Sequence, residues 1–353
     1  MIKKTLLAIS LLVSIQVFTQ NNTLYVGSYT KNTESEGIYT YSFNQKTGVL
    51  NNKKLIAKTV NPSYLAISKN KKLLYTVSEN GKDGVVKAYN ITKKGKLNFI
   101  NEVNSNGAGP CHVEINKSTN KVVTSNYGGG TVSIYNVNKN GSLNEAFQVI
   151  DHNIKEDKAR AHSAQFLKNN LFIADLGRDF LSHYIKKNNN YVLKKQHLMK
   201  NGAGPRHFEI SKKGKFIYVI NELNSTVTVL KNDGGNYKNV QSIGTLKHGY
   251  IGKNSCADIH LSKNGKYLYG SNRGENSIVV FKVDKKTGKL LKIQNISVEG
   301  NWPRNFKLSP NGKFMLVANQ KSNNISVFKV DKTSGKLTYK NSYNTPSPVC
   351  LKF

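Results

Sequence analysis

The run Gly204-Pro-Arg-His-Phe-Glu-Ile-Ser211, followed by Phe216-Ile-Tyr-Val-Ile-Asn-Glu222, determines the architecture because its pattern returns along the chain. The second run is almost continuously apolar and rich in β-branched and aromatic residues, and the two runs have the length of short strands. Each copy continues with a third alternating run, such as Thr226–Leu230, and with a fourth after a glycine turn, as at Gly335. The pattern therefore predicts four short strands per repeat. The other clear copies read Asn61-Pro-Ser-Tyr-Leu-Ala-Ile-Ser68 with Leu73-Leu-Tyr-Thr-Val-Ser-Glu79, and Trp302-Pro-Arg-Asn-Phe-Lys-Leu-Ser309 with Phe314-Met-Leu-Val-Ala-Asn-Gln320.

Alignment of the first strands gives seven equivalent positions, which lie 44 to 51 residues apart. Four-stranded repeats of this period are typical of a propeller, whose blades pack radially around a channel. The first part of the chain supplies only strands two to four of a blade, and Pro348–Phe353 reads as a lone first strand, so we expect the two ends to complete one blade together. The sequence predicts an all-β, seven-bladed β-propeller of four-stranded blades in one domain, residues 21–353. The seven positions are Pro62, Pro110, Ala161, Pro205, Cys256, Pro303 and Pro348; the three early strands are Leu24–Ser28, Ile38–Phe43 and Leu50–Ala57.

Residues 1–20 have the pattern of a signal peptide. Met1-Ile-Lys-Lys4 is a positive n-region, and the apolar stretch Thr5–Val17 is too short to span a bilayer comfortably. We expect cleavage near Gln20 and an exported chain, periplasmic or extracellular, without stable membrane insertion. A retained anchor is the alternative, and the absence of cysteine after the apolar stretch disfavours a lipoprotein.

The three cysteines, Cys111, Cys256 and Cys350, fall in first strands of different blades. Separate blades keep them apart, so we expect small buried apolar side chains and no disulfide. No Cys-x-x-Cys or His-x-x-x-His spacing occurs. Glutamate and aspartate oxygens could offer ligands to calcium, but the arginines expected beside them oppose a divalent cation. The sequence therefore predicts no metal and no other cofactor.

The formal net charge is +33, or +31 once Lys3 and Lys4 leave with the signal peptide. A charge of this size favours anionic partners in general. The lysines are scattered through turns and strand exteriors, however, and no nucleic-acid recognition motif or stripe of basic and aromatic residues occurs. We interpret them as a solubilising coat and expect no nucleic-acid partner.

Only five of the 53 basic side chains are arginines. A chain that uses lysine wherever a positive charge suffices is expected to keep arginine where a planar, multiply donating guanidinium is needed, as in contact with a carboxylate or a phosphate. Arg206 and Arg304 take the same first-strand position, and Arg273 ends a second strand. The other two are Arg160 and Arg178.

Three rings of aligned positions are predicted to face one mouth of the central channel. The innermost strand of each blade lines the channel, and its start lies at the same end as the end of its antiparallel partner. The first ring is Ser63, Cys111, His162, Arg206, Ala257, Arg304 and Val349; the second is Tyr64, His112, Ser163, His207, Asp258, Asn305 and Cys350; the third is Tyr29, Glu79, Tyr127, Leu176, Glu222, Arg273 and Gln320. A cluster of several cations and few anions suits an anionic ligand. Any one histidine in it is as compatible with a structural role as with a functional one.

This set of residues has the groups that hydrolysis of an ester or a lactone requires. A glutamate or histidine can activate water as a general base, while guanidinium groups hold an anionic group and stabilise an oxyanion. No Gly-x-Ser-x-Gly elbow occurs to mark a serine nucleophile. Gly128–Gly130 precedes a predicted strand, Thr131–Tyr135, and not a helix, so we interpret it as a turn and not as a phosphate loop.

Six motifs resemble those of the seven-bladed propeller lactonases. This family includes bacterial 6-phosphogluconolactonase of the cycloisomerase-2 type and fungal carboxy-cis,cis-muconate cyclase, and the resemblance covers essentially all of the chain after residue 20. Signatures of WD40 and kelch propellers are absent. The motifs are Gly109-Pro-Cys-His112, Ser125-Asn-Tyr-Gly-Gly-Gly130, Asp175-Leu-Gly-Arg-Asp179, Gly202-Ala-Gly-Pro-Arg-His207, Asn221-Glu222 and Ser271-Asn-Arg273.

The resemblance implies hydrolysis of a small sugar lactone, which we expect to be anionic. It implies a catalytic set in which arginines grip a phosphate or carboxylate and either Glu222 or His162 manages the proton. The implied catalytic residues are His162, Arg206, Glu222 and Arg273. The convergence of the three rings, together with the resemblance for Arg304, adds the expected substrate-binding residues Arg304, His112, His207, Glu79 and Asp258.

Two further readings and one departure stay open. The phosphorylated lactone of this family arises in the cytosol, whereas the predicted signal peptide indicates export, so an unphosphorylated aldonolactone is an alternative substrate. The same mouth could serve a non-enzymatic propeller that binds an anionic glycan or a protein, or a cycloisomerase of the muconate type, because one fold hosts many functions.

Overall fold

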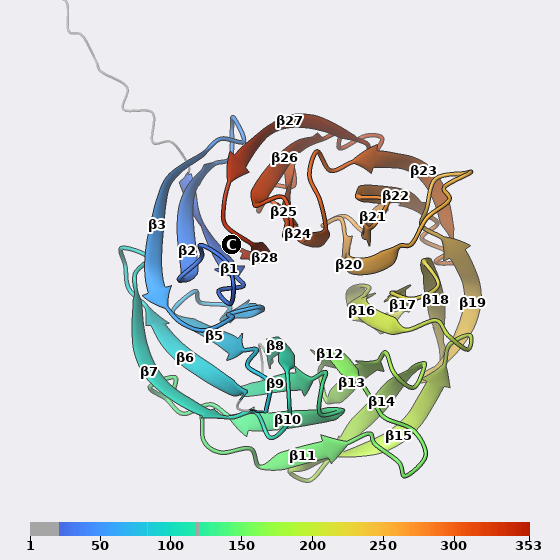
Figure 1. The fold of residues 1–353 in the computed structure, drawn as a ribbon. Helices are drawn as coiled ribbons and strands as arrows, with labels where there is room; N and C mark the ends of the chain where they lie inside the picture. The colour runs from blue at the N-terminus through green and yellow to red at the C-terminus, as the bar shows by residue number, and fades with distance from the viewer. Residues whose placement is uncertain (1–20, 83, 117–119) are drawn as a thin grey trace, which may run out of the picture.

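Seven four-stranded antiparallel sheets stand around a central axis and form a closed ring (Figure 1). The structure, a computed structural model, describes residues 21–82, 84–116 and 120–353; the signal peptide predicted for residues 1–20 lies outside them. Among the described residues the one helical element is a 3₁₀ turn, η1 (Lys212–Gly214). The prediction of an all-β, seven-bladed propeller is confirmed.

The first strand of each blade lies at the centre of the ring and the fourth lies at its rim (Figure 1). Blade 1 contains β28 (Pro348–Lys352), β1 (Asn21–Ser28), β2 (Gly37–Asn44) and β3 (Leu50–Lys58); blade 2 contains β4 (Leu65–Ile67), β5 (Leu73–Ser78), β6 (Val85–Ile91) and β7 (Leu97–Asn104); blade 3 contains β8 (Pro110–Asn116), β9 (Lys121–Asn126), β10 (Thr131–Asn136) and β11 (Gln148–Asp151); blade 4 contains β12 (Ala161–Leu167), β13 (Asn170–Asp175), β14 (Phe180–Lys187) and β15 (Asn190–Leu198). Blade 5 contains β16 (Pro205–Ile210), β17 (Phe216–Asn221), β18 (Thr226–Asp233) and β19 (Asn236–Gly244); blade 6 contains β20 (Ser255–Leu261), β21 (Tyr267–Arg273), β22 (Ser277–Val283) and β23 (Leu290–Ser297); blade 7 contains β24 (Pro303–Leu308), β25 (Phe314–Asn319), β26 (Asn324–Val330) and β27 (Leu337–Asn344).

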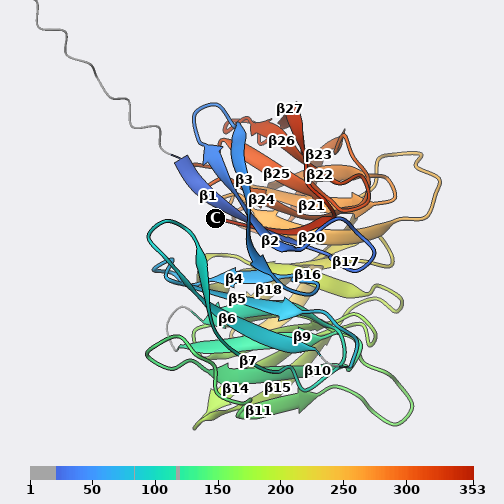
Figure 2. The same ribbon diagram turned by 60° about the vertical axis from the view of Figure 1, so that its left-hand side comes forward.

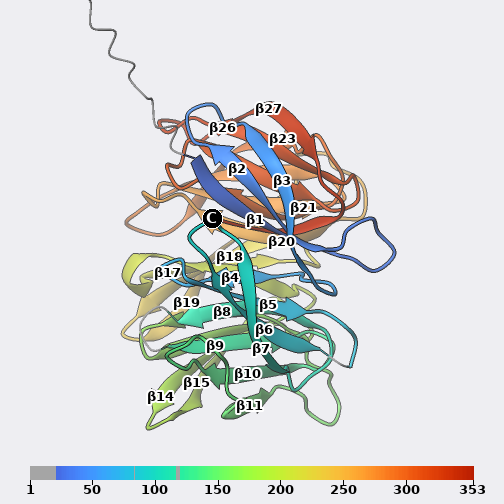
Figure 3. The same cartoon turned by 90° about the vertical axis from the view of Figure 1, so that its left-hand side faces the viewer.

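The two ends of the described chain close the ring as predicted. β28 pairs with β1 in antiparallel register, with Val26 opposite Leu351. In Figures 2 and 3, which show the ring from the side, the C-terminus lies beside β1. This pairing removes the open edge that the first and last blades would otherwise expose.

Apolar side chains fill the spaces between neighbouring blades and hold the ring together. At the junction of blades 1 and 7, Phe43 meets Phe314 edge to face, with 5.9 Å between ring centroids, and also contacts Phe353. Such packing stabilises each blade only when its neighbour is present, because a single blade cannot bury both of its faces.

Most first strands begin where the repeat alignment places them, but two differ. β20 begins at Ser255, one residue before Cys256, and β4 begins at Leu65, three residues after Pro62. Before β4 the chain turns sharply: Asn61 has a φ of +40°, and the backbone N–H of Ser63 donates to the carbonyl of Asn61 at 2.7 Å. This turn takes up the residues that form strand in the other blades.

Two buried histidines between blades 4 and 5 make the fold sensitive to acid. His183 stacks on Phe172 with 4.4 Å between ring centroids, and His197 packs edge to face on Tyr237. Burial lowers the pKa of each imidazole from 6.5 to about 4. Because the unfolded chain takes up these protons at a higher pH, the stability that the neutral rings contribute is complete above pH 6.5 and is lost as the pH falls towards 4.

We expect His183→Phe to reduce this acid sensitivity. Phenylalanine keeps the stack on Phe172 but does not titrate, so the loss of unfolding free energy between pH 7 and pH 5 should shrink by roughly 1 kcal/mol. Urea unfolding at the two pH values measures the difference, and the exposed His248, replaced in the same way, is the control. The same loss in His183→Phe as in the wild-type chain would contradict this explanation.

Candidate functional site

A recurring β-bulge at the start of the first strands turns the predicted site residues into the channel. In five blades the pairing of the first strand with the second omits one residue, which is Cys111, His162, Arg206, Arg304 or Val349. A bulge places two successive residues opposite one and re-aims their side chains. Five of the seven positions of the first predicted ring are therefore bulge positions, and their neighbours in the second ring also face the channel.

Glu222, at the end of β17, is the centre of an ion-pair cluster at the mouth. Its Oε2 lies 2.8 Å from Nη2 of Arg273 and 2.8 Å from Nε of Arg206, the latter as an ion pair whose angle falls short of a hydrogen bond. Arg206 is 2% exposed and Arg273 is 4% exposed, whereas solvent reaches the Glu222 side chain. Burial on its own raises the pKa of Glu222, but the arginines outweigh it and hold the pKa below its usual 4.5. Glu222 is consequently a carboxylate at neutral pH.

Backbone carbonyls fix both arginines from behind. Nη1 of Arg206 donates to the carbonyl of Ala257 at 2.5 Å, and Arg273 donates to the carbonyls of Ser255 and Cys256 at 3.2 and 3.0 Å. The two guanidinium groups thus have fixed orientations before any ligand binds, which lowers the cost of ordering them.

Arg304 and Glu79 form a second, looser pair across the mouth. Nη2 of Arg304 lies 4.0 Å from Oε2 of Glu79, which also accepts a hydrogen bond of 2.8 Å from the hydroxyl of Tyr29. Burial alone lowers the pKa of Arg304, but Tyr29 and Glu79 more than compensate and raise it. Both pairing partners are partly open to solvent, so a ligand can reach this pair.

His162 lies beside the arginines as a neutral imidazole. It is 4% exposed, and burial together with Arg206 holds its pKa well below 6.5. Its ring packs edge to face on Tyr127 with 5.5 Å between centroids, and its Nδ1 has no hydrogen-bond partner in the described part of the chain. A neutral ring with an unpartnered nitrogen can accept or pass on a proton.

Three other predicted site residues lie one layer deeper in the channel. His112 packs on Tyr64 with 4.4 Å between centroids, and His207 lies 5.7 Å from His112. Burial lowers the pKa of His207 to about 4 and that of His112 well below 6.5, so both rings are neutral. His207 is 5% exposed and follows Arg206 along β16, one residue further from the mouth.

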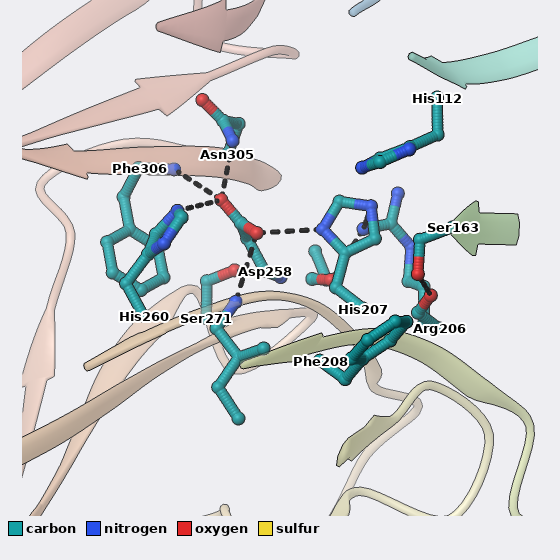
Figure 4. A network of polar contacts seen from close by, with 12 residues as sticks. His112, Ser163, Arg206, His207, Phe208, Asp258, His260, Ser271, Asn305 and Phe306 are labelled. Atoms are coloured by element: carbon teal, nitrogen blue, oxygen red, sulfur yellow. Dashed lines mark hydrogen bonds and ion pairs between the residues drawn. The ribbon is translucent and has the colours of Figure 1, made fainter. Parts of the chain in front are cut away.

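Asp258 is the hub of this deeper layer (Figure 4). It is 1% exposed, and its two oxygens accept from donors in three blades. His207 donates through Nδ1 at 2.7 Å and His260 through Nε2 at 3.1 Å, while Asn305 Nδ2 and the backbone N–H groups of Ile259 and Phe306 complete the set. These donors hold the pKa of Asp258 well below 3.8, although burial alone would raise it. All its acceptor capacity is engaged, so Asp258 does not face the mouth.

A chain of contacts links this hub to the mouth. Because the Nδ1–H of neutral His207 is donated to Asp258, its Nε2 is an acceptor, and Arg206 Nη1 lies 3.4 Å from it. On the other side of Asp258, Nδ1 of His260 donates to Oε1 of Glu209 at 2.7 Å. Burial alone would lower the pKa of His260, but Asp258 and Glu209 raise it.

Sequence reasoning placed Tyr29 and Tyr127 at the mouth but did not find Trp302. Trp302, the residue before Pro303, supports the guanidinium of Arg273 at 5.3 Å from its ring centroid. Its φ of +67° is rare for a bulky residue and is the kind of backbone strain that occurs at functional sites. The repeat alignment did contain a signal for Trp302, because most residues directly before the aligned first-strand positions are small, as at Gly109, Gly204 and Ser255.

Other clefts and side-chain clusters among the described residues are weaker candidates for the functional site. Clefts of up to 490 Å³ lie between the outer parts of blades, and lysines and asparagines contribute most of their polar groups. In residues 21–82, 84–116 and 120–353 no three His, Cys, Asp or Glu side chains converge as metal ligands would. Cys111, Cys256 and Cys350 are free, buried thiols, as predicted. No helix in this part of the chain is long and apolar enough to cross a membrane.

Fold and site together define a seven-bladed propeller with a cation-rich, histidine-containing mouth, arranged to stabilise negative charge. The family described as "Lactonase, 7-bladed beta-propeller" matches residues 23–353, and the chain belongs to this family of enzymes, which act on a lactone ester. The resemblance seen in the sequence motifs is thereby confirmed.

Named relatives span nearly the whole chain. The 6-phosphogluconolactonase of Bacillus subtilis (strain 168) is 34% identical over 340 residues, which are 93% of this chain and 97% of that protein. The 6-phosphogluconolactonase of Formosa agariphila is 37% identical over 301 residues, which are 80% of this chain and 85% of that protein. The structure of the periplasmic gluconolactonase of Pseudomonas aeruginosa has a TM-score of 0.88 at 31% identity and covers 94% of this chain and 98% of its own.

Proposed function

We propose that this chain hydrolyses a sugar lactone to the open acid at the Arg206–Glu222–Arg273 cluster. The observation that carries the proposal is a partly solvent-exposed carboxylate 2.8 Å from two buried, pre-positioned guanidinium groups, with a neutral histidine beside them. Donors fixed in advance where negative charge develops are the main source of stabilisation in acyl transfer.

Each residue of the cluster has a distinct role in this proposal. Both arginines bind Oε2 of Glu222, and in this proposal Oε1 takes a proton from the attacking water. As the water oxygen bonds to the lactone carbonyl carbon, Arg273 and Arg304 stabilise the oxyanion. When the ring C–O bond breaks, the proton passes to the leaving alkoxide, with His162 as the neutral carrier.

The deeper residues act indirectly in this proposal. His207 and Asp258 hold Arg206 and are positioning residues, because His207 contacts Asp258 through Nδ1 and Arg206 through Nε2, and both oxygens of Asp258 already accept hydrogen bonds. His112 supports the same layer through Tyr64. Glu79 helps to raise the pKa of Arg304 and, in this proposal, lies within reach of the substrate.

We also propose that the chain acts outside the inner membrane. The signal-peptide pattern of residues 1–20 and a periplasmic gluconolactonase among the similar structures both support export. The relatives named as 6-phosphogluconolactonases support an anionic substrate, and the arginine-rich mouth fits one.

The test is proton release from 6-phosphogluconolactone and gluconolactone by the purified chain without residues 1–20, with chelator present and spontaneous opening subtracted. We expect kcat/KM of at least about 10⁴ M⁻¹s⁻¹ for one of the two lactones. Acceleration of neither lactone, with binding of a sugar acid retained, would favour the binding propeller over the enzyme. Consumption of a muconate-type substrate without lactone hydrolysis would favour the cycloisomerase.

A further inference from the structure

Arg160 differs from the other four arginines because nothing in the described part of the chain neutralises it. Arg206 and Arg273 bind Glu222, Arg304 faces Glu79, and Arg178 binds Asp157 at 3.1 Å. The guanidinium of Arg160 forms no ion pair or hydrogen bond with residues that the structure describes. It lies instead over the ring of Tyr127, 5.0 Å from the centroid, and is exposed to solvent.

The position of Arg160 is at the rim of the mouth. It directly precedes β12, in the repeat position that Trp302 takes in blade 7. Tyr127 connects it to the site, because the other side of the Tyr127 contact is His162, and both Glu222 and Arg206 act electrostatically on Tyr127. Arg160 therefore stands on the blade 3 and 4 side of the mouth, whereas Arg206, Arg273 and Arg304 come from blades 5, 6 and 7.

A buried carboxylate fixes the backbone that carries Arg160. Asp175, which is fully buried, accepts from the backbone N–H of Arg160 at 2.8 Å, and its other oxygen accepts from Nδ1 of His152 at 2.8 Å. Nη1 of Arg178 donates to the carbonyl of His152 at 2.6 Å and ties the loop down. The loop of residues 152–160 is thus held by the Asp175–Asp179 motif.

Glycines from two sequence motifs make room for this loop. A Cβ at Gly177 would lie 2.6 Å from the carbonyl oxygen of Lys158, and a Cβ at Gly130, where φ is +68°, would lie 2.9 Å from Cβ of Ala159. Either contact would displace the segment that leads into Arg160. The Ser125–Gly130 and Asp175–Asp179 motifs, which the catalytic cluster does not use, therefore meet in the support of one exposed guanidinium.

We propose that Arg160 forms a subsite for an anionic substituent at the end of the lactone remote from its carbonyl. The inference rests on the proposed lactonase function and extends it from the reacting group to substrate choice. A guanidinium held flat on an aromatic ring still presents its N–H edge, which suits a phosphate or carboxylate group. A substrate whose carbonyl meets the paired arginines would extend its far end across the mouth towards blades 3 and 4.

The experiment compares three lactones in the wild-type chain and in Arg160→Gln: 6-phosphogluconolactone, glucarolactone with a free carboxylate, and neutral gluconolactone. We expect Arg160→Gln to lower kcat/KM about 10- to 100-fold for an anionic lactone, mainly through KM, and less than about threefold for the neutral one. A loss confined to the phosphorylated or to the carboxylated lactone identifies which anion the subsite takes. Arg160→Lys should restore part of the loss.

Lys286→Gln is the matched control, because it removes one positive charge from the β22–β23 turn, which lies at the end of the channel opposite the mouth. Equal loss on all three lactones, no loss on any, or a wild-type chain that turns over only gluconolactone would each overturn the subsite. If the wild-type chain turns over no lactone, the proposed function fails, and 6-phosphogluconate binding by calorimetry then decides the subsite separately. Unchanged affinity in Arg160→Gln would overturn it there too.

Discussion

Glu222→Gln is expected to lower kcat for lactone hydrolysis about 10³-fold, within the range seen when a general base is removed. Glutamine keeps the shape and one acceptor oxygen but cannot take a proton from water. Because the arginines hold the pKa of Glu222 below 4.5, the wild-type carboxylate is ionised throughout the neutral range, and its contribution to activity should fall only as the pH drops below that value. Single-turnover measurement of proton release separates this chemical step from substrate binding.

The variant also leaves Arg206 and Arg273 against a neutral amide, which is expected to cost about 1–3 kcal/mol of stability. Activity is therefore measured below the unfolding transition, and ligand affinity, which should change little, is measured alongside. Glu299→Gln, an exposed glutamate between β23 and β24, is the control for loss of one negative charge. Formate should restore turnover in Glu222→Ala if the missing group is a base.

His162→Ala gives the complementary test of the proton assignment. If Glu222 is the base, His162→Ala should lose about 10-fold in kcat, through slower protonation of the leaving alkoxide. Full turnover in Glu222→Gln together with loss of turnover in His162→Ala would overturn the assignment and make His162 the base.

The repeat pattern was sufficient to predict which strand ends meet at the mouth. Glu222 and Arg273 lie at the ends of second strands and Arg206 lies at the start of a first strand, so their positions in the repeat alone place them together. The distances of 2.8 Å from Glu222 to each arginine agree with this placement. The depth of each residue could not be predicted in this way. A bulge adds one residue without a fixed sequence requirement, since cysteine, histidine and arginine all occupy it. The rule that side chains alternate between the two faces of a strand therefore fails at the start of the first strands, where the residues of the mouth and those of the deeper layer follow one another.

Contacts between residues of different blades also could not be predicted from the sequence. Asp258 collects its donors from β16, β20 and β24, which are some 50 residues apart along the chain. Nothing local in the sequence distinguishes an aspartate at the mouth from one beneath it, so Asp258 was expected to touch substrate. The difference lies in how many donors surround the carboxylate, which only the packing of three blades determines.

Asp258→Asn is expected to lower the free energy of unfolding by about 3 kcal/mol and kcat/KM by 10- to 100-fold, the ranges seen for broken buried ion pairs and for lost supporting partners of a site. Asparagine at position 258 lacks the negative charge that pairs with His260. One of the two carboxylate oxygens is replaced by an NH₂ group, which then faces hydrogen-bond donors instead of acceptors. If the NH₂ group faces His207, the Nδ1 of His207 becomes the acceptor and its Nε2 carries the proton, which then opposes Arg206 instead of accepting from it. An aspartate that orients a histidine tautomer acts in this way in serine proteases.

Two readouts separate this positioning role from a loss of stability alone. Activity measured well below the unfolding midpoint should still be reduced, and ¹⁵N chemical shifts of the His207 ring should report the change of tautomer. The control is Asp284→Asn in the exposed β22–β23 turn, where the carboxylate accepts from the backbone N–H groups of Lys286 and Thr287 and the loss should stay below about 1 kcal/mol. The pKa of Asp258 lies well below 3.8, so its stabilisation is complete above that pH and is lost in acid; in Asp258→Asn this part of the acid dependence should disappear. A folded Asp258→Asn with wild-type kcat/KM would show that Arg206 keeps its position without the hub, because its bonds to Glu222 and to the Ala257 carbonyl would then suffice.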